Sequence, residues 1–375
     1  MKRKVCYISG TRADYGLMRR TLEEIYGRSD LDLSVIVTGM HLDPAYGNTG
    51  SEILADGFVE AARIPVPTEG ADLMAITVSK VLEGCARSFA ENRPDIVLLL
   101  GDRGEMLGAA IAALYLNIPV VHIHGGERSG TVDEPVRHAI SKLAHAHFVA
   151  TEASRQRLVK MGERDEQIFV VGAPGLDGLT DIERRPQVEL RAELGADEQS
   201  PLALLLFHPV VQQAEESAAF TRAVLGALDK VGCIVLALVP NSDHGGEAIR
   251  TSLERAAEAG RVHLRTHIRR DEFISWMAGV DVMVGNSSAG IIEAASFGTP
   301  VVNIGDRQRF RERNSNVTDV PPEREAIARA IGAALEKGRL TAGNVYGDGQ
   351  SSARIADLLA AIALDSTILE KVNQY

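Results

Sequence analysis

The sequence lacks the features by which secreted and membrane proteins are recognised. Its three cysteines, Cys6, Cys85 and Cys233, are scattered, and their spacing predicts no disulfide framework. The opening MKRKVCYIS enters a predicted strand without the long apolar segment of a signal peptide. No apolar run approaches the roughly 20 residues that a membrane-spanning helix needs. We therefore expect a soluble cytoplasmic protein that has no membrane partner.

Positive charge is scarce as well. Forty lysines and arginines stand against 51 aspartates and glutamates, and the net charge of −11 argues against a protein that coats nucleic acid. Local basic pockets remain able to bind phosphate groups. The chain shows no internal repeat and no low-complexity tract. At 375 residues, 45% of them hydrophobic, it is too long for one small core, and two domains are predicted.

Short apolar segments alternate with segments of helical spacing. The strand-like segments are 5–9, 33–39, 95–101, 118–124 and 146–151, followed by a second series at 202–208, 233–240, 262–266, 280–287 and 299–305. Strands that are apolar on both faces and separated by helices are typical of parallel sheets covered on both sides. The predicted fold class is α/β, with two doubly wound Rossmann-like domains facing a cleft.

A polar, proline-containing stretch at about 178–200 is a suitable connection between the domains. We expect an N-terminal domain over 1–178 and a C-terminal domain over 179–354, with a last helix at about 355–375 packing back on the first domain. In such sheets, ligands bind beyond the carboxyl ends of the strands. The polar motifs follow strands in both series, which predicts a ligand site built from both domains.

The segment HIHGGERSGTVDEPVRH, residues 122–138, combines proton-carrying groups with glycines directly after an apolar strand. Strand alternation would place His122 and His124 on one face, which is compatible with a metal site. No carboxylate-rich metal motif accompanies them, so no metal is predicted. Glu134 and His138 are four residues apart on a predicted helix over 133–144 and share one face. Acids that merely stabilise the helix start are the alternative.

Several further motifs offer groups for an anion or a proton. In NSSAGIIEAASFGTP, Ser287 and Ser288 open a helix whose free N–H groups suit a phosphate, and Glu293 suits a ribose diol. An ordinary helix cap with an exposed glutamate is the alternative. The remaining candidates each stand at a predicted strand end and have a plain structural alternative, a solvated arginine, a helix cap or a turn residue; they are Arg12, Asp102, Arg103, His208 and Arg307.

The combination GTRADYG, TGMHLD, GDRGE, HIHGGERSGTVDEPVRHAISKLAH, HPV, NSSAGIIEAASFGTPVVNIG and DRQ resembles the hydrolysing UDP-N-acetylglucosamine 2-epimerases. This is the bacterial sialic-acid-pathway group, related to the epimerase half of the bifunctional animal enzyme. The motifs run in order from residue 3 to about 320. The resemblance implies the glycosyltransferase-B architecture, a homodimer and a reaction without a cofactor.

The implied reaction has two steps. A base removes the proton at C2 while the nucleoside diphosphate leaves C1, and water and a proton then add to the resulting glycal, which releases N-acetylmannosamine and UDP. The resemblance assigns acid and base work to Asp102, Glu127 and Glu134, with Asp133 as a neighbour and His138 near the sugar. It assigns nucleotide or substrate contacts to Arg12, Arg103, His208, Ser287, Ser288, Glu293 and Arg307, and His41 to a loop that closes over the substrate.

Two positions depart from the family pattern. Gly16 stands where the animal enzyme has a serine, and His124 stands where related sequences can carry glutamate, which leaves open which carboxylate acts at C2. UDP-N-acetylglucosamine is the first substrate expected. UDP- or GDP-2,4-diacetamido-2,4,6-trideoxy-glucose, of the legionaminic acid pathway, is the alternative within the family. A glycosyltransferase of the same fold is the alternative from another class, since it would share the nucleotide-binding residues.

Overall fold

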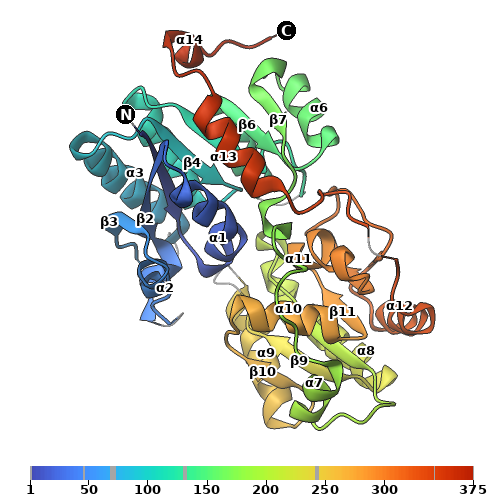
Figure 1. Ribbon diagram of the computed structural model, residues 1–375. Helices are drawn as coiled ribbons and strands as arrows, with labels where there is room; N and C mark the ends of the chain where they lie inside the picture. The colour runs from blue at the N-terminus through green and yellow to red at the C-terminus, as the bar shows by residue number, and fades with distance from the viewer. Residues whose placement is uncertain are drawn as a thin grey trace. The chain divides into compact units, whose positions relative to one another are not determined.

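The structure is a computed structural model that describes residues 2–44, 47–67, 73–129, 133–240, 245–341 and 343–374 (Figure 1). Its contacts divide the chain into two compact units. Unit 1 comprises Met1–Glu127, Asp133–Asp177 and Tyr346–Tyr375, and unit 2 comprises Arg128–Val132 and Gly178–Val345. Residues 346–354, which the sequence places in the second domain, thus belong to the first unit by their contacts.

Unit 1 contains a seven-stranded sheet in the order β3-β2-β1-β4-β5-β6-β7, and every pair is parallel. Its strands are β1 Arg3–Ser9, β2 Leu31–Thr38, β3 Val59–Ile64, β4 Ile96–Leu100, β5 Val120–Ile123, β6 Ala146–Val149 and β7 Ile168–Val170. The chain moves outward from β1 in both directions, so the order reverses between β1 and β4. Such a switch point opens a crevice at the carboxyl ends of the strands, where ligands bind.

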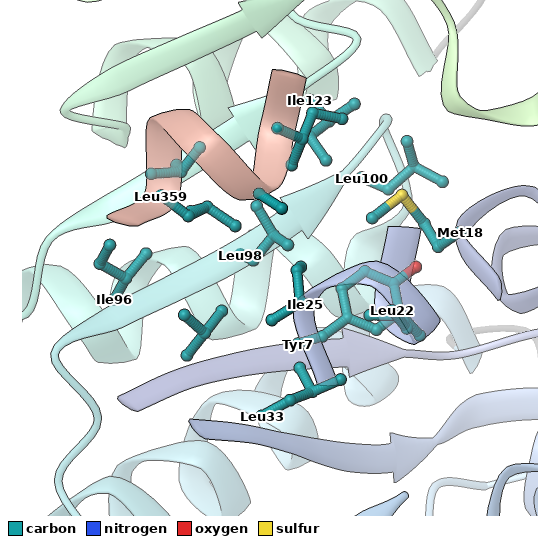
Figure 2. Packing of buried hydrophobic residues seen from close by; sticks show 14 of the residues in the cluster. Tyr7, Met18, Leu22, Ile25, Leu33, Ile96, Leu98, Leu100, Ile123 and Leu359 are labelled. Carbon is teal, nitrogen blue, oxygen red and sulfur yellow. The ribbon is translucent and has the colours of Figure 1, made fainter. Parts of the chain in front are cut away.

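Helices cover both faces of this sheet because the strands are apolar on both faces. On one face, Val5 and Tyr7 of β1 pack with helix α1 (Arg12–Gly27) and with Leu359 of α13 (Ser351–Ala361), and Figure 2 shows this cluster. On the other face, Cys6 and Ile8 pack with the helices α3 and α4. The remaining helices of the unit are α2 Gly50–Ala55, α3 Leu73–Glu91, α4 Gly104–Tyr115, α5 Asp133–Leu143, α6 Glu152–Lys160 and α14 Ser366–Leu369.

The C-terminal helix returns to unit 1 through specific contacts as well as apolar packing. The Thr21 hydroxyl bonds that of Ser352 at 3.0 Å, and Arg28 pairs with Asp357 at 2.5 Å. Asp177 accepts from the backbone N–H of Ser351, which opens α13. The predicted last helix therefore begins at residue 351 instead of 355, and α13 ends at Ala361.

Unit 2 contains a six-stranded parallel sheet in the order β10-β9-β8-β11-β12-β13. Its strands are β8 Leu202–Leu206, β9 Ile234–Leu238, β10 His263–Arg265, β11 Val282–Gly285, β12 Val301–Ile304 and β13 Val317–Val320. Its helices are α7 Gln187–Glu193, α8 Ser217–Val231, α9 Gly246–Glu258, α10 Arg270–Gly279, α11 Ser288–Ile292 and α12 Arg324–Lys337. The predicted fold class, with two Rossmann-like parallel sheets, is confirmed. No helix within the described ranges combines the length and apolarity needed to cross a membrane.

Candidate functional site

The turn after β5 places a carboxylate and an imidazole together inside unit 1. Residues 124–126 form a turn in which His124 has φ 65° and Gly126 has φ 74°. Glu127 follows and is completely buried. Its Oε1 is hydrogen-bonded to Nδ1 of His124, which is 9% exposed. This contact between the two side chains closes the turn.

A buried arginine connects this turn to the end of β4. Arg137 of α5 is 1% exposed, and its Nη1 donates to the backbone carbonyl of Glu127 at 3.1 Å. Its Nη2 donates to Oδ2 of Asp102, which follows β4. One guanidinium therefore brings two of the predicted acids, Asp102 and Glu127, into one place. Sequence analysis missed Arg137, although its place in VDEPVRH, one residue before the predicted His138, was an available signal.

The side chain of His122 makes its hydrogen bonds inside unit 1. Its Nε2 bonds the carbonyl of Gly101 at 2.7 Å and its Nδ1 bonds the Ser141 hydroxyl at 3.1 Å. Burial lowers the pKa of His122 to about 3, so the ring is neutral at pH 7. Strand β5 ends at Ile123, and His124 has left the extended conformation, so strand alternation does not describe the pair. Among the described residues no cluster of histidine, cysteine and carboxylate side chains is arranged to hold a metal ion.

Helix α5 begins at Asp133 and carries the other predicted acid. Glu134 and His138 lie on one face as predicted, with 3.5 Å between Oε1 of Glu134 and Nε2 of His138. Both side chains are partly exposed, at 20% and 31%, unlike Glu127. Residues 130–132 of the motif lie outside the described part of the chain.

The arginine that follows β1 and the arginine that follows β4 are each paired with a carboxylate. Arg12 opens α1 and its Nε pairs with Glu52 at 3.1 Å. Arg103 pairs with the buried Glu105 at 3.0 Å. In both cases the partner orients a guanidinium, so neither arginine is a freely rotating surface group. Thr11 and Asp14 close a capping box at the start of α1, which explains why the helix begins at Arg12.

His41 is the predicted loop residue whose environment differs most from the expectation. It is completely buried in a short helical turn, Gly39–Leu42. Its Nε2 bonds the Ser9 hydroxyl at 2.9 Å and its Nδ1 bonds the Thr49 hydroxyl at 2.8 Å. Burial also lowers the pKa of His41. The ring therefore links the loop to β1 by hydrogen bonds. Because it is buried, it is not accessible to a ligand in this conformation.

In unit 2, Asn286 organises the predicted nucleotide-binding residues. This buried side chain accepts from the backbone N–H of His208 at 2.7 Å and donates to the carbonyl of His208 at 2.9 Å. The carbonyl of Asn286 accepts from Arg307 at 3.1 Å and from the buried Gln308, also at 3.1 Å. The structure thus joins His208 and Arg307, about 100 residues apart, through Asn286. Neither Asn286 nor Gln308 was among the predicted site residues.

The neighbouring helix α11 begins where the sequence predicted a helix, but the environment of Glu293 differs from the prediction. The Ser287 hydroxyl caps α11 by accepting from the N–H of Ala289 at 3.4 Å, and Ser288 is the first helical residue. Glu293 is neither an exposed glutamate nor a freely available acceptor. Its side chain is 5% exposed and pairs with Arg270 of α10, because a buried carboxylate needs a counter-charge.

Comparisons with known proteins point to one family. The family model described as UDP-N-acetylglucosamine 2-epimerase matches residues 23–360. The chain is 50% identical to a UDP-N,N'-diacetylbacillosamine 2-epimerase (hydrolyzing) of Legionella pneumophila over 377 residues, which cover 100% of both chains. It is 34% identical to a UDP-N-acetylglucosamine 2-epimerase of Neisseria meningitidis serogroup B, over 96% of this chain and 95% of that one.

The fold is shared with a solved structure of a UDP-GlcNAc 2-epimerase from Neisseria meningitidis bound to UDP-GlcNAc. The TM-score is 0.78, and the likeness covers 95% of this chain and 99% of that chain at 20% sequence identity. At this identity the likeness concerns the fold alone.

Proposed function

The chain belongs to the UDP-N-acetylglucosamine 2-epimerase family, and from this premise we propose that it is a hydrolysing 2-epimerase acting on a UDP-linked 2-acetamido sugar. The reaction takes the nucleotide sugar and water to UDP and the free sugar inverted at C2. The observation that carries the proposal is the pairing of Asp102 with Arg137, whose guanidinium also holds the backbone of Glu127. Two acids are thereby held at the carboxyl end of one sheet.

Among substrates, we place UDP-N,N'-diacetylbacillosamine, the 2,4-diacetamido-2,4,6-trideoxy sugar, first. The full-length relative with 50% identity carries that name, whereas the relative named for UDP-N-acetylglucosamine is 34% identical. UDP-N-acetylglucosamine, the first expectation from the sequence, is the second candidate. The two sugars differ at C4 and C6, which lie away from the bonds that react.

In the proposed mechanism, a carboxylate of unit 1 takes the C2 proton. The electron pair of that C–H bond forms the C1=C2 double bond while the C1–O bond to the diphosphate breaks. Water then adds at C1 and gives one proton to a carboxylate, while a second acid donates a proton to C2 from the other face. Asp102, Glu127 and Glu134 are the groups proposed for these transfers, because proton transfer needs acids in both protonation states within reach of one carbon.

For the nucleotide, we propose Ser287, Ser288, His208 and Arg307 of unit 2 as contacts. The hydroxyls and N–H groups at the start of α11 and the fork-shaped guanidinium suit phosphate oxygens. The buried Asn286 holds His208 and Arg307 in place and so prepares the site before the ligand arrives. The expected homodimer stays a prediction, which sedimentation analysis of the purified protein would check.

The test is incubation of the purified protein with UDP-N,N'-diacetylbacillosamine, its GDP-linked form or UDP-N-acetylglucosamine, without an acceptor. We expect UDP release together with the free 2-epimeric sugar, and deuterium at C2 when the solvent is D₂O. Asp102→Asn and Glu127→Gln should abolish turnover and leave UDP binding intact, while Glu91→Gln, an exposed carboxylate of α3, serves as the control. Absence of nucleotide release from every sugar would refute the hydrolysing activity, and release only with an added acceptor would identify a glycosyltransferase.

A further inference from the structure

The turn that carries Glu127 contains a backbone conformation that its sequence does not favour. His124 adopts φ 65°, a left-handed conformation in which a side chain lies too close to the following carbonyl oxygen. Among the described residues, only Asn48 and Asn117 share a positive φ without being glycine, and asparagine tolerates it better. Strained residues of this kind persist where the surrounding structure holds them, and they cluster at functional sites.

The surroundings do hold this turn. The carbonyl of Gly126 accepts from Arg157 of α6 at 2.9 Å, and the carbonyl of Glu127 accepts from Arg137 of α5 at 3.1 Å. Gly126 leaves no room for a side chain, since an added Cβ would lie 2.4 Å from the carbonyl oxygen of Ser154. The N–H of His124 donates to the carbonyl of Phe148 in β6 at 3.1 Å. Three elements thus fix the backbone on both sides of the His124 side chain.

The left-handed backbone at His124 is accompanied by a hydrogen bond between the side chains of His124 and Glu127. Glu127 is completely buried, and a carboxylate removed from water is stabilised by hydrogen bonds that its charged form accepts. The Nδ1 of His124 supplies such a bond to Oε1 of Glu127. With an extended backbone at residue 124, the imidazole would point in a different direction. The left-handed conformation therefore directs the imidazole toward the carboxylate three residues ahead.

We propose that His124 is a positioning residue for Glu127, and that its Nδ1–H donates to Oε1 and sets the orientation in which the carboxylate exchanges a proton with the sugar. This inference rests on the proposed function for its effect on turnover. During the proton transfer, the Nδ1–H bond stays intact, while the C2–H bond breaks, the new O–H bond forms on the carboxylate and the diphosphate leaves C1. The imidazole thus acts through Glu127 and does not itself take the proton of the substrate.

Two substitutions separate the hydrogen bond from the backbone strain. His124→Gly accepts the left-handed conformation without cost but removes the donor. His124→Asn also tolerates that conformation, and its amide Nδ2 stands where the imidazole carries Nδ1. The same substitution at the exposed His263 of β10, His263→Asn, is the matched control.

We expect kcat of His124→Gly to fall about 100-fold, because a misdirected reacting group costs a factor of that order. The KM of this variant should stay within about threefold of wild type, since nucleotide binding is untouched. His124→Asn should recover kcat to within about tenfold of wild type by restoring the donor. A fully active His124→Gly, an Asn variant as slow as the Gly variant, or a loss confined to KM would each overturn the proposal.

A second measurement does not depend on turnover. In protein labelled with ¹⁵N-histidine, we expect one proton-bearing Nδ1 signal that disappears in His124→Asn and shifts in Glu127→Gln. A His124 signal that stays unchanged in Glu127→Gln would refute the contact itself. If the wild-type protein hydrolyses none of the nucleotide sugars while this signal behaves as expected, the proposed function fails and the contact between His124 and Glu127 stands.

Discussion

Replacement of Arg137 by methionine tests whether its buried guanidinium links Asp102 to the turn that carries Glu127. The side chains of Arg137 and Asp102 are 1% and 25% exposed, so the pair lies largely out of water. Removing one partner of a fully buried pair costs roughly 3–5 kcal/mol. The Asp102 side chain is 25% exposed and can be partly hydrated once Arg137 is replaced. We therefore assign about 2 kcal/mol to this contact. The lost bond to the carbonyl of Glu127 adds about 1 kcal/mol, which gives about 3 kcal/mol in total.

The assay has to report on unit 1. The chain's only tryptophan, Trp276, is buried in α10 of unit 2, so its fluorescence follows the other unit. Hydrogen exchange of the β4 amides in urea reads unit 1 directly. We expect the free energy of unfolding from the β4 amides to fall by about 3 kcal/mol in Arg137→Met, with the Trp276 transition unchanged.

A double-mutant cycle then isolates the ion pair. Asp102→Asn should destabilise the wild-type protein but cost much less in the Arg137→Met background, with an interaction energy of about 2 kcal/mol. Strictly additive effects, or a loss below about 1 kcal/mol in Arg137→Met, would refute the inference that this guanidinium joins the two acids. Such a result would indicate that the pair behaves like an exposed surface contact.

Two further predictions concern His122 of unit 1 and the residues of unit 2 that we propose as nucleotide contacts. Burial lowers the pKa of His122 to about 3, whereas an unfolded histidine titrates near 6.5, so the unfolded state binds more protons between these values and stability should fall as pH drops from 6.5. His122→Gln should reduce the slope of unfolding free energy against pH, measured by urea titration, by up to about 1.4 kcal/mol per pH unit, and an unchanged slope would contradict this. Asn286→Ala should weaken UDP binding about tenfold in calorimetry, because the backbone of His208 loses both bonds to the Asn286 amide, while the backbone carbonyl that accepts from Arg307 remains; an unchanged affinity would count against the role of Asn286.

The strands missed by sequence analysis show where local pattern is insufficient. β3, β7 and β13 each lie at a sheet edge and have one neighbour instead of two. The β13 sequence VTDV is partly exposed throughout, and β3 and β7 also carry exposed positions. A strand that is not covered on both faces needs no continuous apolar run, so its sequence resembles that of a loop. Central strands such as β4, with five buried apolar residues, were predicted because they need that run.

The residues of the candidate site were likewise predicted only in part. Sequence motifs predicted Asp102, Glu127 and the Ser287 cap, because loops at strand ends carry a local chemical pattern. Arg137 was not assigned although it lies within the motif, because an arginine in an amphipathic helix is usually solvated and only packing shows that this one is buried. Glu293 gained its partner from α10, 23 residues earlier in the chain.

The α/β class, the succession of central strands and the family could be read from consecutive residues, because hydrophobic period and motifs are local properties. Only the folded chain shows which charges are paired, that His41 lies in the interior and that His124 turns toward Glu127 in a left-handed conformation. These features were not predictable because burial and hydrogen-bond partners depend on segments distant along the chain. HIHGGE specifies the groups, and the packing of α5 and α6 specifies where they point.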